Sequence, residues 1–331
     1  MSSQTSHHDV LVIGSGLTGA LIAAQLAQQG ARVAVVDAVG AIGSATRRAL
    51  GLAVPHPHPA HWAETARGVK QLVQICEAHR VPVRLCSVGY LATHEAGRAR
   101  LQRLALAEAS APATWNEALP IHQNAVAEGL LAEAGALVDL ERLCAVLLHQ
   151  RNITLRYPLE VMRLERESRA VYALSQGYTL SADWIVLATN AFTGLLSPYL
   201  GESVRLLTSV TWRSYPLPDE AVRLEHPIVV NEGEFAVLPL DDGSVHAIAC
   251  SADPLAPHAN LTALLRELDE SLLMHTAEQC SGVLTAGAEG APLVGRLDSQ
   301  ARVLYAIGLG PFGAAWAPLV CERVLALMQT P

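Results

Sequence analysis

A glycine-rich turn near the N-terminus constrains the fold of this chain more than any other feature. The apolar run at residues 8–13 is typical of a buried parallel strand, and the turn GSGLTG at residues 14–19 follows it directly. Small apolar residues then recur at helical spacing up to Gly30, and a second apolar run at residues 32–36 ends at Asp37. This order of strand, glycine-rich turn, helix, strand and acid predicts a Rossmann-like unit.

Each part of this unit has a physical role in binding a dinucleotide. Gly14 permits the tight turn, Gly16 lets the backbone approach a pyrophosphate, and Gly19 lets the helix pack closely on the sheet. The N-terminus of the helix presents free N–H groups to phosphates, and Asp37 can accept hydrogen bonds from a ribose diol. The unit therefore predicts dinucleotide binding, but it does not separate NAD from FAD.

Composition limits the class of protein. The chain has 331 residues, enough for two domains, and its 51% hydrophobic residues exclude a disordered chain. The net charge of −8 disfavours nucleic acid as a partner. The six cysteines form no CxxC pair, which argues against a zinc site and suits a reducing compartment. No apolar run reaches about 18 residues, so we expect a cytoplasmic protein without a membrane span.

Four later segments carry a family resemblance. They are GSATRRALGL (43–52), ADWIVLATNAFT (182–193), the stretch at 281–297 that ends in APLVGRL, and VLYAIGLGPFG (303–313). Together with the first turn, and in this order, they resemble the D-amino-acid oxidase-like family of FAD-dependent oxidoreductases. The wording ATNAFT is most similar to the gamma-glutamylputrescine oxidoreductase branch, with glycine oxidase nearby.

The resemblance implies an α/β (overall α+β) architecture of two interleaved domains. A Rossmann-like FAD-binding domain with a parallel sheet would come from residues 1–80, 137–205 and 281–331. A substrate domain built on an antiparallel sheet would come from 81–136 and 206–280. The alternating stretches at 236–239 and 244–248 independently predict a β-hairpin, and residues 101–111 and 262–280 have helical spacing.

The resemblance also assigns the residues that would hold non-covalent FAD. The pyrophosphate and ribose would contact Gly14, Ser15, Gly16, Leu17, Thr18, Gly19, Asp37 and Ala38. The remaining contacts would come from Ser44, Ala45, Arg48, Ala49, Gly51, Val161, Thr189, Asn190, Gly282, Gly308, Gly310, Pro311, Phe312 and Gly313.

The chemistry that this implies is oxidation of the C–N bond of a small amine or amino acid. A hydride would move to the flavin, the resulting imine would hydrolyse, and oxygen or another acceptor would reoxidise the flavin. No catalytic side chain is assigned, and the candidate pocket residues are Arg48, His56, Phe312 and Trp212. The sequence names neither the substrate nor the acceptor, and a homo-oligomer is left open.

One departure from the family concerns the substrate carboxylate. Amino-acid oxidases of the family hold it with an arginine just after the "G-L" of the late segment, where this chain has Leu284. Arg47, Arg48 and Arg213 are candidates to replace that arginine, although each also fits a phosphate contact or a solvated charge. The absence of an arginine at position 284 therefore weakens the hypothesis that this chain oxidises simple amino acids.

Two further departures leave a non-catalytic alternative open. Leu50 replaces a glycine near the flavin, and Phe235 replaces a tyrosine hydroxyl of several relatives. A flavin-binding assembly subunit with a degenerate site is therefore one alternative, and an NAD-linked dehydrogenase that uses only the first unit is another.

Two clusters have competing interpretations. The three histidines in HPHPAH at residues 56–61 suggest a metal, but no cysteine or paired acid completes a ligand set, so we expect no metal site. His56 then fits either a loop or a contact beside the flavin. Glu232 and Glu234 fit either attraction of a cationic amine or solvated hairpin charge.

Arg48 generates the first testable prediction. It falls near the position where relatives of the dimethylglycine dehydrogenase type tether flavin through a histidine, and arginine cannot form that bond. We expect acid precipitation of the purified protein to release all of the flavin into the supernatant. Yellow colour retained in the washed pellet would contradict non-covalent binding.

Overall fold

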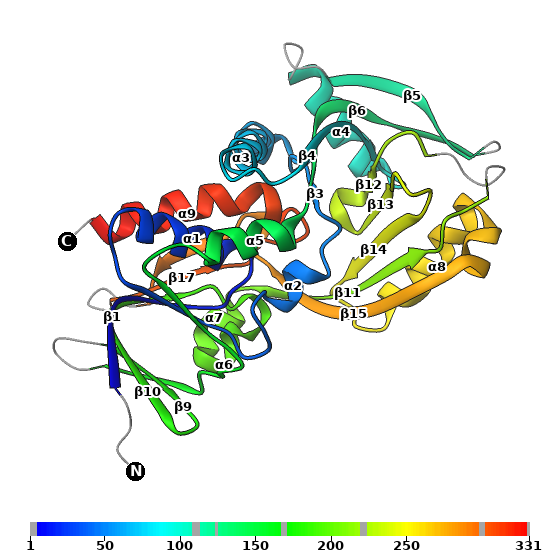
Figure 1. Cartoon of the computed structure of the whole chain (residues 1–331). Coiled ribbons are helices and arrows are strands. Elements are labelled where there is room, and N and C mark those ends of the chain that lie inside the picture. Colours follow the sequence, from blue (N-terminus) through cyan, green and yellow to red (C-terminus); the bar gives the residue numbers. More distant parts are fainter. Residues whose placement is uncertain are drawn as a thin grey trace.

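The fold class predicted from the sequence is confirmed: the chain is a mixed α/β structure built on two sheets (Figure 1). The computed structural model describes residues 5–107, 113–122, 125–166, 171–218, 224–297 and 302–329. Parallel pairing dominates the first sheet, here called sheet A, and antiparallel pairing dominates the second, called sheet B.

Sheet A contains the N-terminal glycine-rich unit. Its strands lie in the order β16 (Leu293–Arg296), β17 (Val303–Ile307), β10 (Tyr178–Leu187), β1 (Thr5–Ile13), β2 (Val33–Val36) and β7 (Ile153–Arg156). The five consecutive strands from β17 to β7 are parallel, and β16 is an antiparallel edge. A small antiparallel extension, β8 (Arg163–Arg166) and β9 (Val171–Ser175), pairs with β10.

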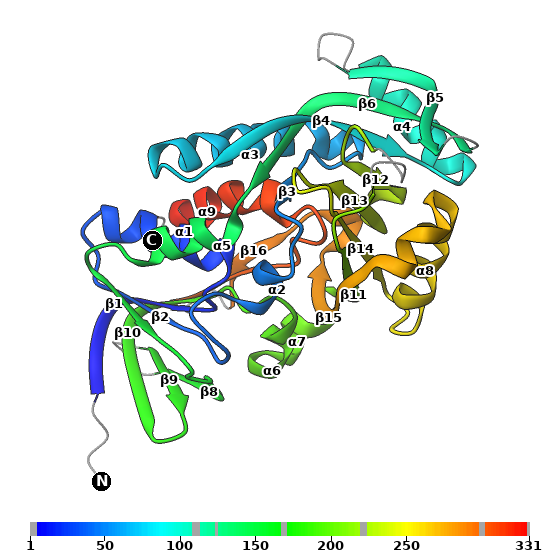
Figure 2. The same cartoon turned by 45° about the vertical axis from the view of Figure 1, so that its right-hand side comes forward.

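The central parts of the parallel strands are apolar because both faces of sheet A are covered. Val10 and Val12 of β1 face one hydrophobic cluster, and the alternate residues Leu11 and Ile13 face another. The first cluster includes side chains of the helices α1 (Leu17–Gln28), α3 (Pro59–Ala78), α5 (Leu140–Leu148) and α9 (Gly313–Gln329). Helices α1, α5 and α9 lie above the sheet and α3 lies on α9, whereas β8, β9, α6 (Thr193–Leu196) and α7 (Pro198–Glu202) lie on the other side (Figures 1 and 2).

Sheet B lies beside sheet A and is the larger of the two. Its order is β15 (Thr276–Ala286), β11 (Arg205–Ser214), β14 (Val245–Ser251), β13 (Phe235–Pro239), β12 (Ile228–Val230), β4 (Val83–Leu91), β6 (Ala125–Val138) and β3 (Leu52–Ala53), with β5 (Ala113–His122) pairing to β6. Within the described part of this sheet, only β12 and β4 pair in parallel. Helix α8 (Ala256–Leu268) packs on this sheet through Leu261 and Leu265, and α4 (Glu95–Ala107) lies near β5 and β6 (Figure 2).

The predicted hairpin is confirmed, whereas one predicted helix is wrong in its second half. β13 and β14 pair as an antiparallel hairpin around Asp241–Gly243. Residues 269–280, however, are not a continuation of α8. Asp269 is extended (φ −168°, ψ 121°) and its carboxylate accepts the amide of Ser271, which begins the short 3₁₀ turn Glu270–His275, and β15 starts at Thr276. The helix predicted at 101–111 is α4 as far as Ala107, and its last residues lie outside the described part.

The strands of the two sheets separate along the predicted domain ranges, apart from β3 and the ends of a few strands of sheet B. Every strand of sheet A lies within 1–80, 137–205 or 281–331. Most of sheet B lies within 81–136 and 206–280, but β3 comes from the first range and pairs with β6, while β15 runs on to Ala286. The two-domain division itself stays a prediction, with β3 as a strand that passes from one sheet to the other.

Helix α3 lies against α9 at a distance that depends on a glycine. A Cβ on Gly68 would lie 1.9 Å from the carbonyl oxygen of Ala315. Gly68→Ala should therefore force the helices apart and lower the free energy of unfolding, since overpacking costs about 1–3 kcal/mol against about 1 kcal/mol of helix propensity gained. Urea unfolding measures the change. Gly40→Ala is the control, because no atom lies within 4 Å of its Cβ position; equal losses in both variants would contradict the prediction.

Candidate functional site

The glycine-rich turn between β1 and α1 is built by backbone-to-backbone contact. Gly14 has a left-handed φ of +107°, and a Cβ there would lie 2.4 Å from the carbonyl oxygen of Ala188 at the end of β10. A Cβ on Gly19 would lie 2.0 Å from the carbonyl oxygen of Gly14. Both positions exclude any side chain, so the turn and the helix behind it keep the closest approach that a polypeptide allows.

Asp37, at the end of β2, holds this turn in place. One carboxylate oxygen accepts hydrogen bonds from the Ser15 amide (3.0 Å) and the Ser15 hydroxyl (2.9 Å). The other accepts from the amides of Val39 (3.0 Å) and Gly40 (3.3 Å). The acid predicted to bind a ribose thus lies beside the glycine-rich turn and orients it through Ser15.

The segment 43–51 closes over the start of α1. It contains the short helix α2 (Ser44–Arg47), and a Cβ on Gly43 would lie 2.8 Å from the amide nitrogen of Gly16. The hydroxyl of Thr46 accepts the amide N–H of Leu17 at 3.0 Å, which satisfies one of the unpaired donors at the helix N-terminus. Thr46 was not predicted as a site residue, although it lies between Ala45 and Arg47 in the segment 43–52 that carries the family resemblance.

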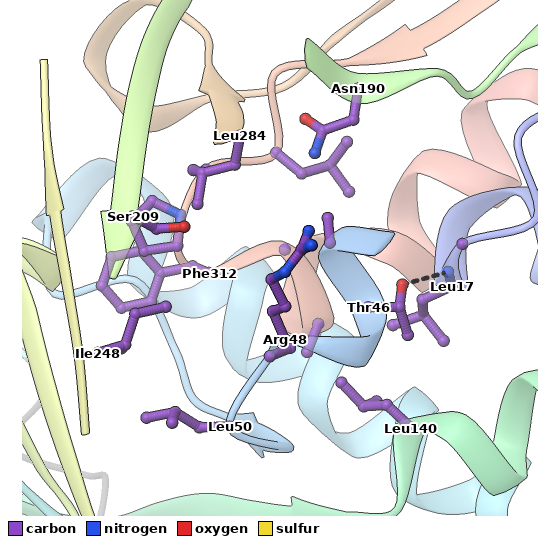
Figure 3. Close-up of a pocket in the computed structure, with 18 of the residues that line it drawn as sticks. Leu17, Thr46, Arg48, Leu50, Leu140, Asn190, Ser209, Ile248, Leu284 and Phe312 are labelled. Atoms are coloured by element: carbon purple, nitrogen blue, oxygen red, sulfur yellow. Dashed lines mark hydrogen bonds between the residues drawn. The ribbon is translucent and has the colours of Figure 1, made fainter. Parts of the chain in front are cut away.

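A cavity of about 200 Å³ lies where the two sheets meet, next to this turn (Figure 3). Twelve of the predicted cofactor residues line it: Gly16, Leu17, Thr18, Ala45, Arg48, Ala49, Asn190, Gly282, Gly310, Pro311, Phe312 and Gly313. Its opposite wall comes from sheet B and includes Ser209, Val229, Ala236, Ile248 and Leu284. Ser209 and Ile248 were not predicted, because a single polar or apolar residue inside a strand gives no sequence signal.

The other predicted residues support the wall or lie apart from it. Gly14, Ser15, Gly19 and Asp37 form the turn described above, Ala38 is exposed beside it, and Ser44 begins α2. The Thr189 hydroxyl bonds that of Thr193, Gly308 (φ +75°) packs against Gly287, and Gly51 (φ +73°) packs against Val138. Val161 is buried in the second cluster of sheet A.

The cavity wall is mostly apolar. Asn190 reaches it from the start of a 3₁₀ turn (Asn190–Phe192), and its amide oxygen accepts both the amide and the hydroxyl of Thr285 at 3.1 and 2.9 Å. Arg48 is its only ionisable residue among those described, and its side chain points toward the side of the cavity that holds Asn190 and Leu284 (Figure 3). The arrangement offers one cation and no described acid or base.

His56 lies just behind this wall. Its ring packs on Phe312 with centroids 4.5 Å apart, and its Nδ1 accepts the amide N–H of His58 at 3.1 Å. Burial, and then the nearby His61 and His58, lower the pKa of His56 from 6.5 to about 3. The ring is therefore a neutral imidazole that supports Phe312. The described residues contain no cluster of His, Cys, Asp and Glu arranged to hold a metal.

Trp212 does not line this cavity. It is 2% exposed within the core of sheet B, and its indole N–H donates to the Thr276 hydroxyl at 2.9 Å. The prediction that Trp212 is a pocket residue of this cavity is therefore wrong. Side chains alternate between the two faces of a strand, and on this strand Ser209 is on the face toward the cavity. Phe235 likewise does not line the cavity: its neighbour Ala236 does, and Phe235 packs against the core of sheet B.

A second, outer hollow of about 580 Å³ lies on the other side of the segment 46–50. Arg47 and Arg213 line this hollow and not the inner cavity, and Arg213 pairs with Asp242 at 2.9 Å. Arg48 and Leu50 line both spaces. The segment is thus a partition, and Arg48 is the one of the three candidate arginines that reaches the inner side.

Comparisons with known proteins agree on the fold. A family model described as FAD dependent oxidoreductase (DAO) matches residues 9–327. Glycine oxidase from Geobacillus kaustophilus superposes with a TM-score of 0.82 at 19% identity, covering 98% of this chain and 95% of that one. L-proline dehydrogenase from P. horikoshii gives 0.80 at 16% identity (98% and 94%). L-alpha-glycerophosphate oxidase from Mycoplasma pneumoniae, with FAD bound, gives 0.77 at 16% (98% and 96%). No curated protein sequence matches the chain.

The buried His56 predicts a pH dependence of stability. Between pH 6.5 and 3 the unfolded state binds a proton that the folded state refuses. The free energy of unfolding should therefore fall as the pH drops through this window, by up to about 1.4 kcal/mol per pH unit from this one group. Urea unfolding at several pH values should show a shallower slope for His56→Gln, while His149→Gln, at an exposed position, keeps the wild-type slope. Equal slopes for wild type and His56→Gln would contradict this account.

Proposed function

The chain belongs to the FAD dependent oxidoreductase family, and on this premise we propose that it oxidises the C–N bond of a small amine or amino acid. The observation that carries the proposal is the cavity at the junction of the sheets. One wall consists of the glycine-rich turn, the segment 43–51 and the start of α9, and the other consists of sheet B. Such a junction places a cofactor from one sheet against a substrate from the other.

The residues at the first wall fit FAD. The cavity reaches the N-terminus of α1 at Gly16, Leu17 and Thr18, where the helix dipole favours a phosphate, although the Leu17 amide is already bonded to Thr46. Gly14 and Gly19 pack so closely that no side chain obstructs this approach. Gly16, Thr18, Asn190 and the turn 310–313 would hold the cofactor. FAD, when bound, supplies the acceptor for a hydride from the carbon that bears the nitrogen.

The second wall supplies position rather than acid–base chemistry. Ile248, Leu284 and Phe312 exclude water from the reacting carbon, and Ser209 offers a hydroxyl. Because no described residue of the wall is a general base, the amine must enter in its neutral form. The imine product then hydrolyses in water, and oxygen or another acceptor takes up the electrons.

The choice of a nitrogen substrate rests on resemblance. Glycine oxidase and L-proline dehydrogenase are named for amino acids, whereas L-alpha-glycerophosphate oxidase is named for a molecule without nitrogen. The segment at 182–193 resembles the corresponding segment of amine-oxidising members of the family, which supports a nitrogen substrate. The NAD-linked alternative is wrong, because the FAD family model extends through the late segments as far as residue 327.

Location and assembly follow as smaller proposals. All six cysteines are free, and four of them are buried, which supports a reducing compartment such as the cytoplasm. Within the described residues no helix combines the length and the hydropathy that crossing a bilayer requires. We keep the two interleaved domains and leave a homo-oligomer open.

Anaerobic reduction of the flavin tests the proposal. Glycine, sarcosine, proline, D-amino acids, polyamine derivatives and glycerophosphate are mixed in turn with the purified flavoprotein. At least one nitrogen compound should bleach the flavin, and its rate should rise with pH until the amine is neutral. Bleaching by glycerophosphate alone would contradict the proposal, and bleaching by no compound would favour a non-catalytic flavin-binding subunit.

A further inference from the structure

We infer that Arg48 binds an anionic group of the substrate, so that this site takes carboxylate-bearing amines and rejects cationic polyamines. The inference rests on the proposed function and narrows it to one substrate class. It depends on how Arg48 is placed relative to the other charges of the chain and to the strand that carries Leu284.

Among the described residues, Arg48 is the single cation that lines the inner cavity. Of the three arginines near the site, Arg47 and Arg213 face the outer hollow, and Arg213 is already paired with Asp242. No acidic side chain among the described residues pairs with Arg48 or lines the inner cavity. Arg48 is exposed and has no protein counter-charge among the described residues, so its guanidinium is available to an anion that enters the cavity.

The Arg48 side chain crosses the cavity to sheet B. A Cβ placed on Gly282 of β15 would lie 3.2 Å from Cδ of Arg48 and 3.6 Å from Nη1 of Arg48. The buried hydroxyl of Ser209 lies 3.2 Å from the same point. Arg48 and Ser209 therefore offer neighbouring polar groups to one ligand atom or group.

This position compensates for Leu284. Gly282 and Leu284 are two residues apart on β15, so they face the same side of the strand, and both line the cavity. Leu284 leaves that side without a cation, and Arg48 brings a guanidinium to it from the opposite wall (Figure 3). A planar guanidinium can bind a carboxylate through two parallel hydrogen bonds.

Glu232 and Glu234, the two acids considered for attracting a cationic amine, have partners outside the inner cavity. Glu232 forms an ion pair with Arg100 at 3.0 Å, and Glu234 accepts from the side-chain amide of Asn231 at 3.1 Å. Neither carboxylate lines the inner cavity. A substrate that carries only positive charge would meet Arg48 without any described counter-charge in the wall.

An anion can also come from FAD itself, through its phosphates, and the experiment separates the two sources. The holoprotein is titrated with benzoate and with its uncharged isostere benzamide, and the visible spectrum of the flavin reports binding. Bound FAD per chain is measured for every variant. Because the readout is binding and not turnover, it does not depend on knowing the substrate.

We expect wild type to bind benzoate more tightly than benzamide. Arg48→Gln should raise the Kd of benzoate by about 10- to 100-fold, because a charged hydrogen-bonding partner is lost. The Kd of benzamide and the FAD content should stay unchanged. The benzoate Kd of Arg48→Lys should lie between those of wild type and Arg48→Gln, since lysine keeps the charge but cannot form two parallel hydrogen bonds to a carboxylate. Arg47→Gln makes the same charge change one residue away, outside the inner cavity, and should bind both ligands as wild type does.

Three results would overturn the inference: no response of the wild-type flavin to benzoate, an unchanged benzoate Kd in Arg48→Gln, or loss of FAD in that variant with benzoate binding retained in the fraction that stays loaded. A protein purified without flavin would contradict the proposed function. A flavoprotein that reacts with amines but ignores benzoate would contradict only the role of Arg48.

Discussion

The structure depends on the backbone contact between the glycine-rich turn and the end of β10. Gly14 is held against Ala188 and Gly19 against Gly14, at distances that no side chain permits. Asp37 fixes the same turn through Ser15, and Thr46 fixes the start of α1 through Leu17. Because these contacts join β1, β2, β10 and the segment 43–51, they define one wall of the cavity before any ligand is considered.

Much of that wall could be predicted from the sequence, and the reason is local. A left-handed glycine, a helix N-terminus and an acid after a buried strand act within a few residues of one another, so their spacing is visible in the chain. The sheet B wall is different. Ser209 and Ile248 face the cavity only because two strands pair in a particular register, and Trp212 turns away for the same reason. Register depends on tertiary pairing, and one residue of shift exchanges the faces.

The specificity of the site is set by a few side chains on a widely used fold. Proteins named for glycine, proline and glycerophosphate share this architecture at 16–19% identity. In this chain Leu284 and Arg48 line the inner cavity, and Arg48 belongs to segment 46–50, which also borders the outer hollow. Fold and cofactor class follow from backbone geometry, and the substrate class that we propose rests on the position of Arg48.

The central claim is that the glycine-rich turn, segment 43–51 and the start of α9 together form a site for FAD. Extraction of the purified protein followed by chromatographic identification of the released cofactor tests it most directly. The account predicts FAD in stoichiometric amount with the chain. A nicotinamide dinucleotide, FMN, or a colourless protein that takes up no FAD when it is supplied would contradict it.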